Sequence, residues 1–202
     1  MVFGFFQRIS LLELQKHNDI AGAIQYCIVS TCGEPVNTVN LKRRYPMAEL
    51  KEYTVEHIFS YEGITDPAPD FIGPVAQGIR LNAYFSGGTV SGPKVNGKIL
   101  PVGGDFITVR TDGVGDIDVR LSIQTDDGAL IYQTNTGVLE LGENGYEDFM
   151  NMNLQEVIQV RANIRFQTSH ENYQWLNRKQ CIGIGQFFAL EGKVKYDVYA
   201  LG

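Results

Sequence analysis

The spacing of apolar residues in the first part of the chain is helical. Ile20, Ile24 and Cys27 recur at three- to four-residue intervals, as on one face of an amphipathic helix. Residues 34–46 follow with two prolines and mostly polar residues, which is typical of a linker. We therefore expect an N-terminal extension, residues 1–50, that holds one short helix.

Beyond residue 50 the period changes to two, which predicts a β domain over residues 51–202. The first strand is expected from about Tyr53, because Val55, His57, Phe59 and Tyr61 alternate with Glu56, Ile58 and Ser60. Similar alternation marks residues 78–85, 117–124 and 160–167. Residues 66–74 contain three prolines and are predicted to form a loop, since proline is excluded from a central strand.

Glycine-containing dipeptides between the alternating segments predict tight hairpins. Asn96-Gly97 and Asp127-Gly128 are strong two-residue turn signals, and Glu191-Gly192 is a weaker one. Consecutive hairpins make antiparallel neighbours, which either close into a barrel or fold into two packed sheets, and we expect the closed barrel. The pattern leaves open whether the polar or the apolar face lines the interior.

Composition and charge narrow the classes of partner. The chain has 202 residues, 44% of them hydrophobic, with 22 glycines, 11 Phe and 10 Tyr, as suits one all-β core. A net charge of −6, with Lys42-Arg43-Arg44 as the sole basic run, argues against nucleic acid. Charged residues interrupt the apolar N-terminus, so we expect no membrane span. The three cysteines are an odd number and show no disulfide framework, which favours a reducing, cytoplasmic location.

No motif for a cofactor or a metal stands out, and we expect neither. Cys27 and Cys32 lack a second ligand pair. Gly183-Ile184-Gly185 is not followed by a predicted helix, so the sequence does not support a dinucleotide site there. Residues 112–118 resemble a calcium loop in composition but lack its spacing and its closing glutamate.

Several short motifs in a fixed order resemble the DUF3237 (UPF0311) family from about residue 53 to the C-terminus. They are Gly87-Gly88-Thr89, Ser91-Gly92-Pro93, Leu100-Pro101, Gly103-Gly104-Asp105, Asp112-Gly113, Asp118-x-Arg120, the segment 125–131 and Tyr173-x-Trp175-Leu176-Asn177. The resemblance implies a closed antiparallel β-barrel similar to those of allene oxide cyclase and dirigent proteins. Some barrels of that shape are cofactor-free isomerases or cyclases, but fold alone does not carry function.

Asp105, Asp118 and Arg120 are the candidate catalytic residues. Asp118 and Arg120 lie two apart and share a strand face, so they can grip a ligand oxygen if that face lines the interior, or form a structural ion pair. Asp105 follows two glycines at a strand entrance. It can act as a general acid or base if burial raises its pKa, or it can accept backbone N–H groups.

A second group of residues can bind the substrate if their strands are neighbours. Converging cations and aromatic walls suit an oxygen-rich or anionic ligand, whereas the plain alternative is solvent-facing arginines and core aromatics. The candidates are Arg80, Tyr84, Arg161, Arg165, Tyr173 and Trp175.

The leading hypothesis is a homo-oligomeric barrel that isomerises or cyclises an oxygenated aromatic, polyketide or terpenoid-like metabolite, or acts on it as a lyase, without a cofactor. One alternative is a non-catalytic carrier that uses the same pocket. Another is an assembly module whose outer apolar faces drive self-association.

Overall fold

The computed structural model describes residues 52–202, so the helix expected near residues 20–27 lies outside the described residues. The described part is almost entirely β. Its elements are β1 (Val55–Thr65), β2 (Asp70–Val75), β3 (Gly78–Ser91), β4 (Gly97–Val109), β5 (Val114–Thr125), β6 (Leu130–Glu140), α1 (Gly145–Met150), β7 (Val157–Gln167), the 3-10 helix η1 (Glu171–Arg178), β8 (Gln180–Phe188) and β9 (Lys193–Leu201).

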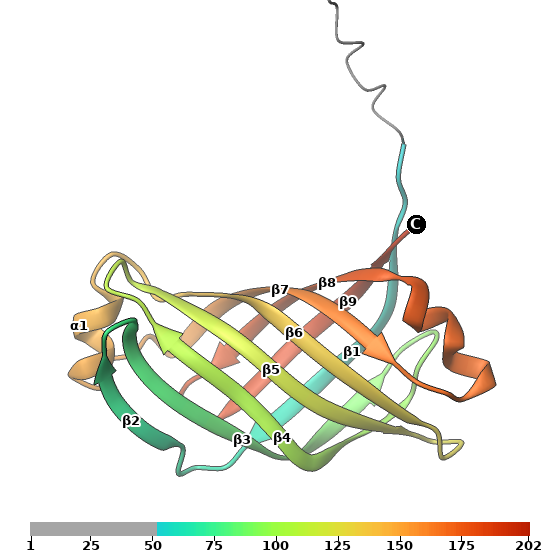
Figure 1. Ribbon diagram of the computed structural model, residues 1–202, viewed down its shortest axis with the longest axis horizontal. Helices are drawn as coiled ribbons and strands as arrows, with labels where there is room; N and C mark the ends of the chain where they lie inside the picture. The colour runs from blue at the N-terminus through green and yellow to red at the C-terminus, as the bar shows by residue number, and fades with distance from the viewer. Residues whose placement is uncertain (1–51) are drawn as a thin grey trace, which may run out of the picture. The chain divides into compact units, whose positions relative to one another are not determined.

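The strands form one antiparallel sheet that closes on itself, which confirms the predicted barrel. The order is β1-β9-β8-β7-β6-β5-β4-β3-β2, and β1 also pairs with β3, so eight strands complete the ring and β2 flanks it. Figure 1 shows the tilted strands, with α1 at one end of the barrel and η1 at the other. Among the described helices, none is long and apolar enough to cross a membrane.

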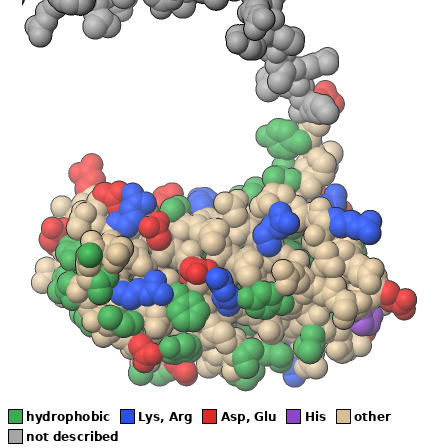
Figure 2. Space-filling model, in the orientation of Figure 1, with side chains coloured by type: hydrophobic (Ala, Val, Ile, Leu, Met, Phe, Trp, Pro, Cys, Tyr) green, Lys and Arg blue, Asp and Glu red, His purple; other side chains and the backbone are tan. Residues whose placement is uncertain are grey.

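The apolar face of each strand points inward, which settles the question that the sequence left open. Val119, Leu121 and Ile123 on β5 are at most 3% exposed, whereas Arg120, between two of them, is exposed. The same phase continues without a shift from β5 to β9, because residues paired across an antiparallel ladder share a face. Bulges interrupt the alternation in β1, β3 and β4. The outer surface carries interspersed acidic and basic side chains (Figure 2).

Two local predictions are corrected. The proline-rich stretch predicted as a loop contains β2, an edge strand paired on one side with β3, and an edge strand accommodates Pro74. Asn96-Gly97 is not a two-residue turn, since β3 ends at Ser91 and neither residue has a positive φ. Asn96 instead bonds the backbone N and O of Gly92, both at 3.0 Å.

Glycine is required at position 97 for a different reason, which is close approach to β5. A Cβ there would lie 2.2 Å from the carbonyl oxygen of Gln124. The other two hairpins are confirmed where the turn glycines predicted them. Gly128 (φ +88°) lies between β5 and β6, and Gly192 (φ +59°) lies between β8 and β9.

Candidate functional site

Asp105 on β4 is the predicted catalytic residue whose side chain faces the barrel interior. It pairs with Ala83 on β3 and with Val119 on β5, and Val119 is 3% exposed, so all three share the inner face. Ala83, Asp105 and the next inward residue, Ile107, nonetheless keep part of their surface accessible to solvent. The carboxyl group is therefore not sealed completely from solvent.

A gap in the β4–β5 ladder holds the carboxyl group in place. The ladder pairs Asp105 with Val119 and resumes only at Thr108 with Asp116. Within the gap, the backbone N–H of Asp118 donates to Asp105 Oδ1 at 3.1 Å, so the side chain replaces a missing ladder acceptor. Among the described residues, no hydrogen-bond donor reaches Asp105 Oδ2, which is left for another partner.

The surroundings raise the pKa of Asp105 to about 7. Desolvation in the barrel wall is the largest cause, and the negative charge of Asp118 adds to it. The hydrogen bond from the Asp118 N–H and the positive charge of Arg80 act in the opposite direction. A carboxyl group that titrates near neutral pH can both take up and release a proton under ordinary conditions.

A hydrogen-bonded polar group lies inside the otherwise apolar barrel. The Tyr61 hydroxyl accepts from Asn135 Nδ2 at 3.1 Å and from Gln133 Nε2 at 3.5 Å. Gln133 Nε2 also donates to Asn135 Oδ1 at 2.9 Å, while Gln133 Oε1 has no partner. Gln133 and Asn135 are fully buried, and burial is the largest of the causes that raise the pKa of the Tyr61 hydroxyl.

Tyr196 extends this group along the interior. Its ring stacks on Tyr61 across the β1–β9 pair, with the centroids 5.1 Å apart. The ring lies over two glycines of β8, because a Cβ at Gly183 or Gly185 would approach it to 2.9 or 2.7 Å. The Gly-Ile-Gly stretch that does not form a nucleotide loop therefore makes room for a buried tyrosine.

These interior residues were missed in the sequence, although one signal was present. Gln133 and Asn135 occupy the same strand phase as Ile131 and Leu139, which are buried. A polar residue in the apolar phase of an alternating strand indicates a polar group on the buried face. The contact with Tyr61 joins strands far apart in the sequence, and no local pattern predicts it.

Asp118 and Arg120 form the ion pair that their spacing suggested, on the outer face of β5. The guanidinium Nη1 and Nη2 atoms donate to the two carboxylate oxygens of Asp118, and both side chains are 44–45% exposed. The Asp118–Arg120 face does not line the interior, so this pair does not contact a ligand bound there. Asp118 acts on Asp105 instead, through its backbone N–H and its charge.

Four of the predicted binding residues also point outward, so they do not converge inside the barrel. Arg80 Nη1 donates to Phe106 O at 3.2 Å, and the Tyr84 hydroxyl donates to Asp70 Oδ2 at 2.8 Å. Arg161 bonds the carbonyl of its neighbour Val160, and Arg165 bonds Gln180.

The two remaining candidates lie on η1, at the opposite end from α1. The Tyr173 hydroxyl donates to Asp127 Oδ1 at 3.0 Å, and Lys94 Nζ lies 5.3 Å from the centroid of the Trp175 ring. Both aromatic side chains are partly buried against the core. Within residues 52–202, no cluster of three or more His, Cys, Asp or Glu side chains could hold a metal ion.

Comparison with known proteins agrees with the fold. The profile of the family described as "Protein of unknown function (DUF3237)" matches residues 53–201. A UPF0311 protein of Rhodopseudomonas palustris (strain TIE-1) is 34% identical over 121 residues, which cover 55% of this chain and 74% of that protein.

Solved structures have the same architecture. A protein of unknown function from Clostridium acetobutylicum superposes with a TM-score of 0.67 at 28% identity, over 75% of this chain and 100% of that one. A structure described as an enzyme from Penicillium herquei gives a TM-score of 0.55 at 22% identity, over 77% and 98%. The second likeness concerns the fold alone.

Proposed function

Since the chain belongs to the DUF3237 (UPF0311) family, whose function is unknown, we propose that its barrel binds a small oxygenated metabolite and isomerises or cyclises it without a cofactor. The substrate is a largely apolar molecule of aromatic, polyketide or terpenoid type. Asp105 takes a proton from one atom of this substrate and returns it to another. The atoms of the substrate are conserved, so no oxidant, reductant or co-substrate is required.

The observation that carries the proposal is the orientation of the Asp105 carboxyl group, together with its hydrogen bonding and its pKa. Its carboxyl group faces the interior, keeps one oxygen free of hydrogen bonds from the described residues and has a pKa of about 7. A purely structural role needs only the bond to the Asp118 N–H and gains nothing from a pKa near neutrality. General acid–base catalysis is most efficient when the pKa lies close to the working pH.

The lining of the interior supports the substrate class. Apolar side chains dominate it, so the bound skeleton is mostly apolar. Tyr61, Gln133 and Asn135 supply polar atoms that favour a molecule with oxygen substituents. Gln133 Oε1 has no hydrogen-bond partner. A hydroxyl of the ligand can donate to this oxygen if the neighbouring side chains shift to make room for the ligand.

Asp118, Arg120 and Arg80 serve as positioning residues in this proposal. Asp118 holds the Asp105 carboxyl group through its backbone N–H, which lowers the pKa of that group. The negative charge of Asp118 raises the same pKa, and the positive charge of Arg80 lowers it. Arg120 holds the Asp118 side chain in place through the ion pair on the outer face.

We also propose that the protein self-associates, with the edge strand β2 as the contact surface. Phe71, Ile72 and Val75 on this edge strand are 54%, 52% and 41% exposed. Apolar side chains on an unpaired edge favour contact with another chain. Sedimentation of the full chain tests this part, and a monomer at all concentrations would remove it.

The test of catalysis looks for a product that has the same mass as the substrate, because an isomerisation leaves the mass unchanged. The full-length protein is incubated with a metabolite extract of its native cells, and bound and free molecules are compared by chromatography with mass detection. We expect wild-type protein to convert one bound species into an isomer of different retention. Asp105→Asn should bind that species with a conversion rate at least a hundredfold lower, as is typical for loss of a general acid or base.

Asp126→Asn is the matched control, because Asp126 is an exposed carboxylate in the β5–β6 turn. Conversion by Asp105→Asn at the wild-type rate would refute the catalytic role. Recovery of a tightly bound metabolite that wild-type protein leaves unchanged would identify a carrier instead.

A further inference from the structure

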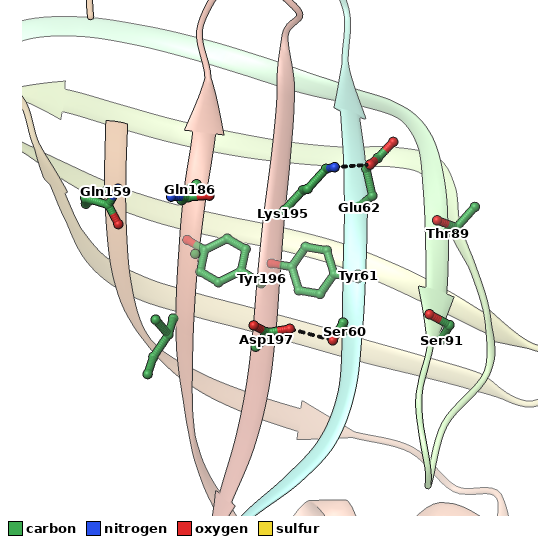
Figure 3. A pocket seen from close by; sticks show the side chains of 12 residues that line it. Ser60, Tyr61, Glu62, Thr89, Ser91, Gln159, Gln186, Lys195, Tyr196 and Asp197 are labelled. Atoms are coloured by element: carbon green, nitrogen blue, oxygen red, sulfur yellow. Dashed lines mark hydrogen bonds and ion pairs between the residues drawn. The ribbon is translucent and has the colours of Figure 1, made fainter. Parts of the chain in front are cut away.

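A polar groove on the outer face of the barrel is separate from the interior site. It has a volume of about 490 Å³ and crosses five neighbouring strands, β3, β1, β9, β8 and β7 (Figure 3). Outward-facing residues form two rows across it, one through Ser60 and Asp197 and the other through Glu62 and Lys195. Tyr61 and Tyr196, which alternate with these residues, have buried side chains.

Each charged group that lines the groove already has a polar partner. Lys195 Nζ lies 3.2 Å from Glu62 Oε2, and Lys193 Nζ lies 3.6 Å from Glu62 Oε1. The Ser60 hydroxyl donates to Asp197 Oδ1 at 2.6 Å, and His57 Nε2 lies 3.0 Å from the same hydroxyl. The dashed contacts in Figure 3 mark the Glu62–Lys195 and Ser60–Asp197 pairs.

This pairing argues against a charged ligand. An anion would meet two carboxylates, Glu62 and Asp197, and a cation would meet the ammonium group of Lys195. An anion bound at Lys195 would have to displace Glu62, and a cation bound at Glu62 would have to displace Lys195. Each displacement costs the attraction that the existing pair already has. A neutral ligand avoids both costs.

The uncommitted groups of the groove are neutral hydrogen-bonding side chains. Thr89, Ser91, Gln159 and Gln186 make no side-chain hydrogen bond within the described chain, and all four line the groove. Together they offer two hydroxyls and two amides, which both donate and accept. Between them Ile184, 44% exposed, adds an apolar surface.

We propose that this groove is a second ligand site, which binds a neutral polyhydroxylated molecule of the size of a mono- or disaccharide. Every hydroxyl of such a ligand can donate and accept a hydrogen bond, which matches the amide and hydroxyl side chains of the groove. Its C–H face packs against Ile184. The volume lies within the range of small-molecule sites. The site is independent of catalysis in the interior.

The experiment titrates the isotope-labelled full chain with maltose and with D-glucose and follows backbone amide shifts by NMR. We expect saturable shifts confined to β1, β7, β8, β9 and the end of β3, with no change at Asp105. Gln159→Ala combined with Gln186→Ala should weaken binding roughly tenfold, since two hydrogen bonds are lost.

Gln124→Ala is the matched control, because Gln124 is a partly exposed outward glutamine of β5, outside the groove. It should leave the affinity unchanged. The proposal is overturned if neither sugar gives saturable shifts, if the double variant binds as tightly as wild type, or if inorganic phosphate binds the groove more tightly than the sugars. Since the readout is binding at the outer face, these results do not depend on any activity of Asp105.

Discussion

Asp105 Oδ1 accepts the backbone N–H of Asp118 across a gap in the β4–β5 ladder, at 3.1 Å. This one contact joins two predicted site residues that lie on opposite faces of the sheet. Because the bond uses the backbone of Asp118, the Asp118 side chain remains free to pair with Arg120 outside the barrel. The outer ion pair and the inner carboxyl group are therefore coupled.

Stability should depend on pH through Asp105. Its pKa is about 7 in the folded protein against an ordinary value of 3.8, so between these values the folded state binds more protons than the unfolded chain. The contribution of Asp105 to the free energy of unfolding is thus greatest at low pH and falls as pH rises from about 4 to about 7, by about 2–4 kcal/mol in total.

Urea denaturation of wild type and Asp105→Asn across this window measures the effect. The variant cannot ionise and should lose this slope, so its stability relative to wild type should increase with pH. Asp126→Asn serves as the control for an exposed carboxylate and should track wild type. Equal slopes for Asp105→Asn and wild type would mean that the Asp105 pKa is not raised.

The two charges next to Asp105 should shift its pKa in opposite directions. Asp118→Asn keeps the backbone N–H but removes the negative charge, so the pKa of Asp105 should fall. Arg80→Met removes a positive charge, so that pKa should rise. Carbon NMR titration of the Asp105 carboxyl group measures both without a substrate, and shifts of the same sign would contradict the coupling.

Tyr61→Phe should lower stability by about 1–3 kcal/mol. The change removes the hydroxyl that accepts from Asn135 and Gln133, and it leaves buried N–H groups without a partner. Tyr132→Phe is the matched control, since Tyr132 is 37% exposed on the outer face and should change stability little. Thermal unfolding compares the two, and equal effects would show that the interior hydrogen bonds contribute nothing.

Gly183→Ala should destabilise the barrel by about 1–3 kcal/mol through overpacking. The new methyl group would lie 2.7 Å from Ile164 Cδ1 and 2.9 Å from the Tyr196 ring. Asn163→Ala, at an exposed outward position of the adjacent strand β7, should be nearly neutral. If Gly183→Ala unfolded at the denaturant concentration of wild type, Tyr196 would not be packed over this glycine.

The local alternation of residues was enough to predict most strands, two of the three hairpin positions and a closed antiparallel barrel. Period-two patterning and turn glycines are properties of neighbouring residues, so they can be read without tertiary contacts. The errors arose where context outweighed local preference. Pro74 is tolerated because β2 has a free edge, and Gly97 is needed because β5 passes close to it.

The division of the candidate site between two faces required the closed barrel. Asp105, Asp118 and Arg120 could all be chosen from the sequence, but an alternating strand has two equivalent faces until ring closure makes one of them the interior. Burial then selected the apolar phase, which left Asp118 and Arg120 outside and Asp105 inside. The side-chain hydrogen bond between Asn135 and Tyr61 likewise connects β6 and β1 across the barrel, because closure brings their inner faces together.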